Sequence, residues 1–302
     1  MNLKSRTALV TRRHTLRALG ALAVTGSLGA CAARPGAVSK AAADPVALQD
    51  PTPSAATLAR YQQMQDHGYT IVAVEPGYLT GSNPRALIYY EGSEPVGSIV
   101  VDPYARRLYL PIGQGLAIRY GCAVGKQGTT FSGNGVIERK VEWPSWAPTL
   151  NMIRTEPEVY TDYAQGVLGG PQNPLGARAL YLYRNGKDTY YRIHGTNNPS
   201  TIGRATSAGC IRLFDQDVIN LYKRVPLGTD VHVRTPEESA AMVGPLKSGY
   251  RGYVIPVHDP EVVIHGPEAN AILDTSAPGD DPAIAAAAAQ IAAQPRPAKA
   301  SA

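Results

Sequence analysis

The chain has few cysteines. Only three occur among its 302 residues, at positions 31, 122 and 210, and this number excludes a framework of structural disulfides like those of small secreted domains. Cys122 and Cys210 could still pair with each other in an oxidising compartment. Cys122 lies in a strand-like run, where a cysteine is usually a small buried hydrophobe. No group of Cys, His, Asp and Glu has zinc-site spacing, so we expect neither a metal nor another cofactor.

Basic runs are absent beyond the first 30 residues. The formal charge is +5 and the isoelectric point is near 9.0. Of the 29 basic residues, five stand before residue 31, where there is no acidic residue, so 24 remain against the 24 acidic ones. Without a basic patch or an interleaved aromatic platform, the sequence argues against nucleic acid as a partner. The hydrophobic fraction of 44% is ordinary for a globular protein of one or two domains.

Residues 1–30 have the layout of a secretory signal peptide, with a basic opening and an apolar stretch that is too short to span a bilayer. Two short segments add detail to this layout. One resembles a twin-arginine export signal and reads Thr11-Arg12-Arg13-His14-Thr15-Leu16-Arg17. The other resembles a bacterial lipobox and reads Leu28-Gly29-Ala30-Cys31. We therefore expect an exported, periplasmic protein that a lipid on Cys31 anchors to a membrane. The alternative is a plain signal peptide in which the arginine pair and Cys31 are incidental.

Four segments follow the signal peptide. Residues 31–56 are rich in Ala, Pro and Ser and are predicted to form a tether. Residues 57–96 form an N-terminal segment with mixed signals, and residues 97–234 have the texture of a β-rich domain. Residues 235–302 form a C-terminal extension that we expect to be largely disordered. Helical propensity recurs at 283–293, but only Ile284 and Ile291 are large and apolar there, which predicts too small a packing face.

Short runs rich in Val, Ile and Tyr recur through the β-rich domain between turns of Gly, Asp and Pro. They predict strands at 98–101, 107–111, 117–124, 136–141, 178–183, 190–194 and 230–234. The exception is Asp215–Val225, where apolar residues recur at helical spacing, with acids at the start and bases near the end. The sequence therefore predicts a mostly β fold with one helix directly after Cys210.

Cys210 follows a turn of small residues that leaves a substrate backbone room to approach its thiol. A thiol needs a base to be a good nucleophile near neutral pH, and His194, sixteen residues earlier, is a candidate. A Cys-His pair alone is weak evidence, because the chain has other histidines. We interpret His232 as structural and His265 as incidental.

Several segments of residues 97–233 resemble, in order, the signature segments of the L,D-transpeptidase family with its YkuD-like catalytic domain. They include Ile99-Val100-Val101-Asp102, Val124-Gly125-Lys126, Trp143-Pro144-Ser145-Trp146-Ala147-Pro148, Asn173-Pro174-Leu175-Gly176, His194-Gly195-Thr196-Asn197, Ser207-Ala208-Gly209-Cys210-Ile211-Arg212-Leu213 and Val225-Pro226-Leu227-Gly228-Thr229. The resemblance implies a β-sandwich or irregular barrel. It also implies a cell-wall enzyme whose partners are the stem peptides of peptidoglycan.

In the implied reaction, Cys210 attacks the carbonyl between a diamino acid and the terminal D-alanine of a stem tetrapeptide. D-Alanine leaves, and an amine acceptor on a second stem takes the acyl group. The resemblance makes His194 the base and the Gly195 carbonyl the group that orients its imidazole. It makes the backbone N–H groups of Cys210 and Gly209 the donors to the developing oxyanion.

The resemblance also points to substrate-binding residues, which are Arg212, Ser207, Thr196, Asn197, Trp143 and Trp146. Arg212 would steady the site loop or meet a substrate carboxylate, unless it is simply an exposed arginine at a helix start. The two tryptophans would line a groove for a glycan or a stem, or else pack in the core. Many members of the family have a histidine where this chain has Ala208, and we expect this change to affect pH dependence or substrate choice.

Other activities of the same site stay open at the level of sequence. Hydrolysis by an L,D-carboxypeptidase, exchange of D-amino acids and attachment of a lipoprotein to the wall would all use the same catalytic residues. A wall-binding lipoprotein without catalysis is an alternative of a different class. The presence of both Cys210 and His194 argues against it.

Overall fold

The computed structural model describes residues 52–125, 132–207, 209–249, 254–275, 277 and 281–296. The predicted signal peptide, Cys31 and most of the tether lie outside these residues, as does Ala208. No helix in the described ranges is long and apolar enough to cross a membrane.

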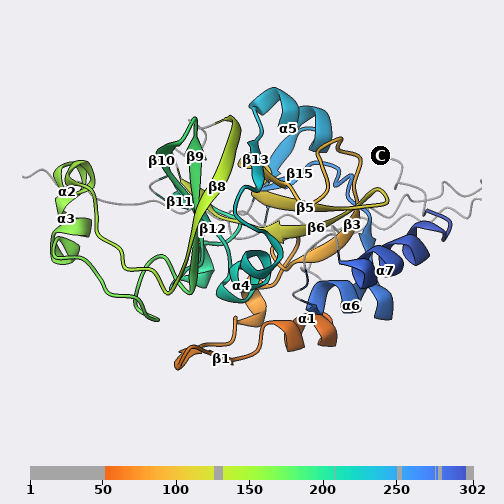
Figure 1. Cartoon of the computed structure of the whole chain (residues 1–302), viewed down its shortest axis with the longest axis horizontal. Coiled ribbons are helices and arrows are strands. Elements are labelled where there is room, and N and C mark those ends of the chain that lie inside the picture. The colour runs from red at the N-terminus through yellow and green to blue at the C-terminus, as the bar shows by residue number, and fades with distance from the viewer. Residues whose placement is uncertain are drawn as a thin grey trace, which may run out of the picture. The chain divides into compact units, whose positions relative to one another are not determined.

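One mixed sheet of ten strands forms the centre of the described fold, in the order β12-β10-β9-β8-β13-β4-β5-β6-β3-β16 (Figure 1). Its strands are β3 Ala86–Tyr89, β4 Ile99–Asp102, β5 Arg107–Gly113, β6 Leu116–Gly121, β8 Gly133–Glu142, β9 Arg178–Arg184, β10 Lys187–His194, β12 Ile211–Arg212, β13 Asp230–Val233 and β16 Val263–Ile264. The pairs β10–β12 and β13–β4 are parallel. The sheet does not close into a barrel within the described part of the chain, because its edge strands β12 and β16 do not pair with each other.

Three two-stranded sheets and several short helices surround this sheet. The small sheets pair β1 Met64–Asp66 with β2 Tyr69–Ile71, β7 Val124–Gly125 with β11 Ala205–Ser207, and β14 Leu246–Ser248 with β15 Val254–Pro256. The α-helices are α1 Ala55–Arg60, α2 Leu150–Thr155, α3 Pro157–Tyr160, α4 Asp215–Arg224, α5 Pro236–Val243, α6 Pro267–Asp274 and α7 Pro282–Ala292. Single 3-10 turns are η1 Pro76–Tyr78, η3 Thr161–Tyr163 and η4 Pro199–Thr201. The prediction of a mostly β fold with a helix directly after Cys210 is confirmed.

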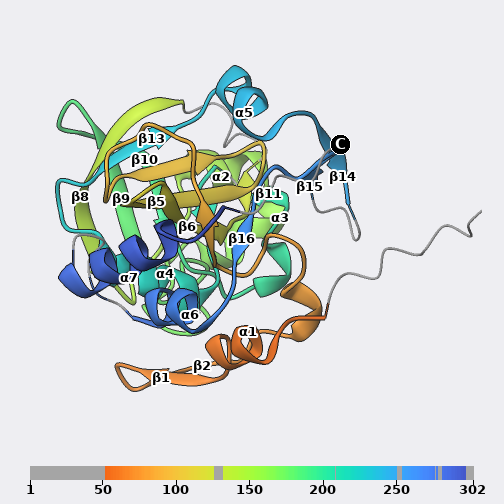
Figure 2. The ribbon, with the colours of Figure 1, turned by 90° about the vertical axis from the view of Figure 1, so that its right-hand side faces the viewer.

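Both faces of the sheet are buried at its centre. Alternate residues of a strand point to opposite faces, so Ile99 and Val101 join the main core while Val100 packs with Tyr109 on the other face. The main core also includes side chains of α4, α6 and α7. Figure 2 shows these three helices gathered on one side of the sheet.

The described parts of the C-terminal extension form helices and strands, so the prediction of a largely disordered extension does not hold for them. Ile284, Ala288 and Ile291 of α7 are at most 3% exposed and belong to the main core. Two isoleucines and an alanine at helical spacing suffice here because α6 and the strands already present an apolar surface. Composition alone cannot reveal a partner that the rest of the fold supplies.

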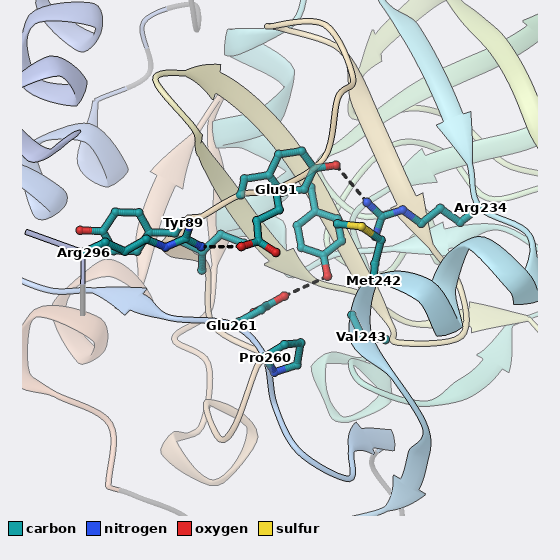
Figure 3. A pocket seen from close by; sticks show the side chains of 11 residues that line it. Tyr89, Glu91, Arg234, Met242, Val243, Pro260, Glu261 and Arg296 are labelled. Carbon is teal, nitrogen blue, oxygen red and sulfur yellow. Dashed lines mark hydrogen bonds and ion pairs between the residues drawn. The ribbon is translucent and has the colours of Figure 1, made fainter. Parts of the chain in front are cut away.

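Charges also fix the C-terminal extension to the sheet. Glu261 has a side chain only 7% exposed and pairs with Arg107 at 2.8 Å and with Arg119 at 2.9 Å. It accepts a further hydrogen bond from the hydroxyl of Tyr109 at 2.9 Å, which Figure 3 shows beside a cavity of about 40 Å³. Both arginines are nearly fully buried on adjacent strands, so they need this carboxylate.

The N-terminal segment is likewise part of the same fold. It supplies β3 to the sheet, and the hydroxyl of Tyr61 donates to the buried carboxylate of Asp217 at 2.9 Å. Arg85 pairs with the same carboxylate at 2.8 Å. Asp66, in the β1–β2 hairpin, pairs with Arg178 at 2.8 Å. These contacts hold the segment against α4 and β9.

Candidate active site

His194 and Arg212 come together because two short strand ends pair in parallel. The register joins Ile193 to Ile211 and His194 to Arg212. Ile193 and Ile211 point into the main core, so His194 and Arg212 point to the opposite face. Cys210 directly precedes β12 and stands two residues before Arg212. The pairing thus brings the segment that carries Cys210 next to the strand that ends at His194.

The Cys210 thiol is half-buried beside the middle of β10. Its sulfur lies 3.9 Å from the carbonyl oxygen of Tyr190. Burial raises the pKa of this thiol, while a hydrogen bond from the Arg192 backbone and the charges of Arg192 and Arg212 act in the opposite direction. The thiol is therefore protonated at neutral pH and needs a base before it can attack.

An irregularity in β10 shapes the surroundings of the thiol. The register with β9 shifts between Asp188 and Arg192, and Tyr190 adopts a φ of +63°, which is unusual for a bulky residue. The carboxylate of Asp188 accepts a hydrogen bond from the backbone N–H of Tyr190 at 2.7 Å and stabilises this turn. The sequence predicted a plain strand here and missed the bulge. The only signal for it is the Asp-Thr pair before Tyr190, which favours local turns.

His194 is buried, at 3% exposure, at the end of β10. Its Nδ1 lies 2.7 Å from the carbonyl oxygen of Gly195. Because a carbonyl only accepts, Nδ1 carries the proton and Nε2 is the basic nitrogen of the neutral ring. Burial and the charge of Arg212 lower the pKa of His194 to about 3, against hydrogen bonds to the backbones of Gly195 and Leu175. The imidazole is therefore neutral at neutral pH, as a general base must be before it takes a proton.

We expect this buried imidazole to make the fold sensitive to acid. Between pH 6.5 and about 3 the unfolded chain binds a proton at His194 that the folded chain does not, so stability falls as the pH falls through this window. Thermal unfolding measures the drop in Tm between pH 6.5 and about 3. This drop should be smaller in His194→Gln than in the unchanged chain, and the two drops should differ by about 2–4 °C or more. His67→Gln, at a side chain 57% exposed, is the control. Equal drops for the two variants would contradict the assignment.

Arg212 supplies positive charge next to the thiol. Its side chain is half-buried, burial lowers its pKa, and the charges of Cys210 and Tyr160 oppose that shift. Its buried Nε has no hydrogen-bond partner, and no ion pair of this guanidinium is found among the residues that the structure describes. Tyr160, at the end of α3, also acts electrostatically on Arg212. Sequence reasoning missed Tyr160, because nothing in its local pattern places it near Cys210.

The two predicted groove tryptophans have different positions. Trp143 is buried in a small core cluster, and its indole N–H donates to Asp66 at 2.7 Å. The structure therefore does not bring Trp143 to the site. Trp146 is half-buried, with ring centres 6.3 Å from Tyr160 and 6.0 Å from Tyr163. Through Tyr160, this aromatic cluster reaches the neighbourhood of Arg212.

The remaining predicted site residues lie around the two strand ends. Thr196 is 4% exposed, and its hydroxyl accepts from the backbone N–H of Asn198 at 3.0 Å, so it stabilises the loop after β10. Asn197 is exposed and donates to the carbonyl of Gln172 at 3.0 Å. The side chain of Ser207 lies outside the described part. Cys122 is fully buried, and it forms no disulfide with Cys210.

Gly209 immediately precedes Cys210 and has a φ of +135°, which an L side chain rarely adopts. Replacing it by alanine would meet no close neighbour, since the nearest atom lies 4.0 Å away in the Tyr191 ring. The cost is therefore backbone strain of about 1–3 kcal/mol. If the loop relieves that strain by turning the Cys210 N–H, we expect turnover to fall about tenfold or more.

Gly228→Ala is the matched control for that variant. Gly228 has a φ of +86°, also with free space around it, but lies in the turn before β13. Both variants should lower Tm, and only Gly209→Ala should lower the rate of acylation. Equal activity of the two variants would show that the conformation of Gly209 does not serve catalysis.

Within the described residues, no group of three or more His, Cys, Asp or Glu side chains is arranged to hold a metal ion.

Comparison with known proteins finds a family model that matches the part of the chain holding Cys210 and His194. Residues 97–233 match the YkuD family model, the L,D-transpeptidase catalytic domain. The chain is 34% identical over 166 residues to the probable L,D-transpeptidase YbiS of Escherichia coli, covering 54% of this chain and 51% of that protein. It is 37% identical over 138 residues to the probable L,D-transpeptidase ErfK/SrfK of Salmonella typhimurium, covering 45% and 43%. The chain thus spans about half the length of the curated relatives it matches.

Among solved structures, a protein from Brucella melitensis described as a probable carnitine operon oxidoreductase is 48% identical and covers 50% of this chain and 94% of that one. Its TM-score is 0.36. A superposition this loose carries no argument about the chemistry of the present site.

Proposed function

We propose that this chain is a peptidoglycan L,D-transpeptidase in which Cys210 is the nucleophile and His194 the base. The observation that carries the proposal is the parallel pairing of β10 with β12, which sets His194 beside Arg212, two residues after Cys210. This pairing lies within the residues that match the catalytic-domain model. Two relatives that share this domain are named as probable L,D-transpeptidases.

The first half of the reaction forms a thioester. Nε2 of the neutral His194 takes the proton of the Cys210 thiol as the sulfur attacks the carbonyl carbon between the diamino acid and D-alanine. The backbone N–H groups of Gly209 and Cys210 donate to the oxyanion, and the positive φ of Gly209 sets their direction. The carbon–nitrogen bond then breaks, His194 returns the proton to the amine, and D-alanine leaves.

The second half transfers the acyl group. An amine of another stem attacks the thioester, His194 takes the amine proton, and the Cys210 sulfur leaves and is reprotonated. Arg212, a cation without an ion-pair partner in the described residues, is placed to bind the terminal carboxylate of the donor stem. Water or a free D-amino acid as the acceptor would give hydrolysis or exchange by the same residues.

We infer that the enzyme works outside the cytoplasm. The basic and apolar leader over residues 1–30 supports export, and the lipobox-like sequence ending at Cys31 supports a lipid anchor. The Ala- and Pro-rich segment that follows would then let the catalytic domain reach the wall. Labelling with radioactive palmitate tests the anchor, because Cys31→Ser should lose the label.

The direct test is product analysis with the full chain purified in detergent. The chain is mixed with a tetrapeptide-stem muropeptide, first alone and then with a second stem as amine acceptor. Intact-mass spectrometry should show an acyl adduct and released D-alanine, and the adduct should move to the acceptor when it is added. Release of D-alanine with no cross-linked product would favour the carboxypeptidase. No adduct on reduced, folded protein would overturn the proposal and favour the non-catalytic wall-binding alternative.

A further inference from the structure

We propose that Asp215 is a positioning residue of this site, and that it acts on His194 through the peptide unit that joins Gly195 to Thr196. The inference rests on the proposed function, and it assigns a role to an acidic residue that the reaction described above leaves unused. Asp215 is the first residue of α4, the helix that directly follows the Cys210 segment.

The carboxylate of Asp215 binds two backbone segments outside its own helix. Its Oδ1 accepts from the N–H of Ala177 at 2.9 Å and from the N–H of Thr196 at 3.2 Å. An acid in the first turn of a helix usually needs no explanation beyond the helix dipole. Here the N-terminus of α4 receives no side-chain capping bond. The carboxylate is therefore directed to the start of β9 and the loop after β10.

The Thr196 N–H and the Gly195 carbonyl belong to one planar peptide unit. The carbonyl end of this unit lies 2.7 Å from Nδ1 of His194, and its N–H end lies 3.2 Å from the Asp215 carboxylate. The three groups form a chain of hydrogen bonds from carboxylate to peptide to imidazole. Hydrogen bonds in such a chain polarise one another.

Two glycines leave the space that the carboxylate occupies. A Cβ at Gly195 would lie 1.9 Å from Oδ1 of Asp215, and a Cβ at Gly176 would lie 2.2 Å from the same atom. Gly176 also has a φ of +61°. Any side chain at either position would displace the carboxylate. The glycine after His194 is thus explained by a close approach that the sequence alone does not reveal.

The charge of Asp215 gives this chain of bonds its chemical effect. When His194 takes the thiol proton, its imidazole becomes a cation, and an ionised carboxylate makes the Gly195 oxygen a stronger acceptor for that cation. In serine proteases an aspartate orients the histidine and stabilises its cation by direct contact. Here one peptide unit stands between the two groups.

The carboxyl loses this effect when it is protonated. Burial raises the pKa of Asp215 to about 6, although the Ala177 and Thr196 N–H groups and the charge of Arg178 lower it, while Asp66 raises it. The carboxylate is ionised above about pH 6 and neutral below it. We therefore expect acylation to slow as the pH falls through 6.

Asp215→Asn tests the proposal, because the amide keeps an oxygen for both N–H groups but carries no charge. In the full chain we expect the acylation rate at pH 7.5 to fall about 5–10-fold, by the difference between a charged and a neutral acceptor. The fall near pH 6 should disappear in this variant. Asp230→Asn, at an exposed acid of β13, should change neither quantity. If Asp215→Asn keeps the acylation rate and the pH profile of the unchanged chain, Asp215 has only a structural role.

A second readout separates this inference from the proposed function. The proton NMR signal of the His194 Nδ1–H is recorded without substrate and should move upfield in Asp215→Asn, because its acceptor is weakened. An unmoved signal would overturn the link whatever the enzyme does. If the unchanged chain forms no acyl adduct but the signal moves, the proposed function fails and the link from Asp215 to His194 stands.

Discussion

Replacing Cys210 by alanine is expected to abolish the acyl adduct and to lower the release of D-alanine by about 10⁴-fold or more, since no other group at the site can carry the acyl chain. The fold should survive, because the Cys210 side chain is half-buried and is not among the residues of the main core. Intact-mass spectrometry and a coupled D-alanine assay measure the two quantities, and circular dichroism checks the fold.

Cys122→Ala is the matched control for the nucleophile. The Cys122 thiol is fully buried, and burial raises its pKa to about 12, so it is neither accessible nor ionised. This variant should keep its activity and lose some stability through a small cavity. Iodoacetamide should modify one thiol of the described domain in the unchanged chain and none in Cys210→Ala. An acyl adduct that persists in Cys210→Ala would show that another residue is the nucleophile.

Glu261→Gln is expected to lower the free energy of unfolding by about 3–5 kcal/mol, because the amide leaves buried Arg119 without an anion and buried Arg107 with only the exposed carboxylate of Asp259. Arg107 and Arg119 have side chains 1% and 3% exposed, and both pair with this carboxylate. Urea unfolding followed by circular dichroism measures the change. The effect on acylation at low urea should be small, since Glu261 belongs to the edge of the sheet remote from Cys210.

Asp259→Asn provides the comparison for Glu261. Asp259 also pairs with Arg107, at 2.9 Å, but its side chain is 46% exposed. A solvent-exposed ion pair contributes at most about 1 kcal/mol, so this variant should unfold close to the unchanged chain. If both variants cost the same, the burial of Glu261 would not be what makes its pairing strong.

The sequence predicted what depends on local pattern and failed where a distant segment decides. Runs of Val, Ile and Tyr predicted strands because both faces of the sheet centre are buried, and the apolar spacing of Asp215–Val225 predicted α4. The prediction for the extension after residue 235 failed because Ile284 and Ile291 pack in a core that other strands build. Trp143 was assigned to a groove, yet its indole N–H meets Asp66 from the β1–β2 hairpin.

The same difference between local pattern and distant contacts applies to the candidate site. The resemblance of short motifs pointed to Cys210 and His194, and the structure adds the strand pairing that sets His194 beside Arg212, two residues after Cys210. Tyr160, the bulge at Tyr190 and the carboxylate of Asp215 could not be predicted in this way. Each depends on contacts between segments separated in the sequence, and single positions carry no mark of such contacts.

The pairing of β16 with β3 joins Leu87 to Ile264, and it has a consequence for how the chain is made. An edge strand, two core helices and the anion of two buried arginines all arrive after residue 258. A ribosome therefore delivers the catalytic residues long before the segment that stabilises them, and contacts this distant in sequence form slowly. A transcript cut before codon 259 should therefore yield an unstable chain that proteases degrade, and not a smaller active enzyme.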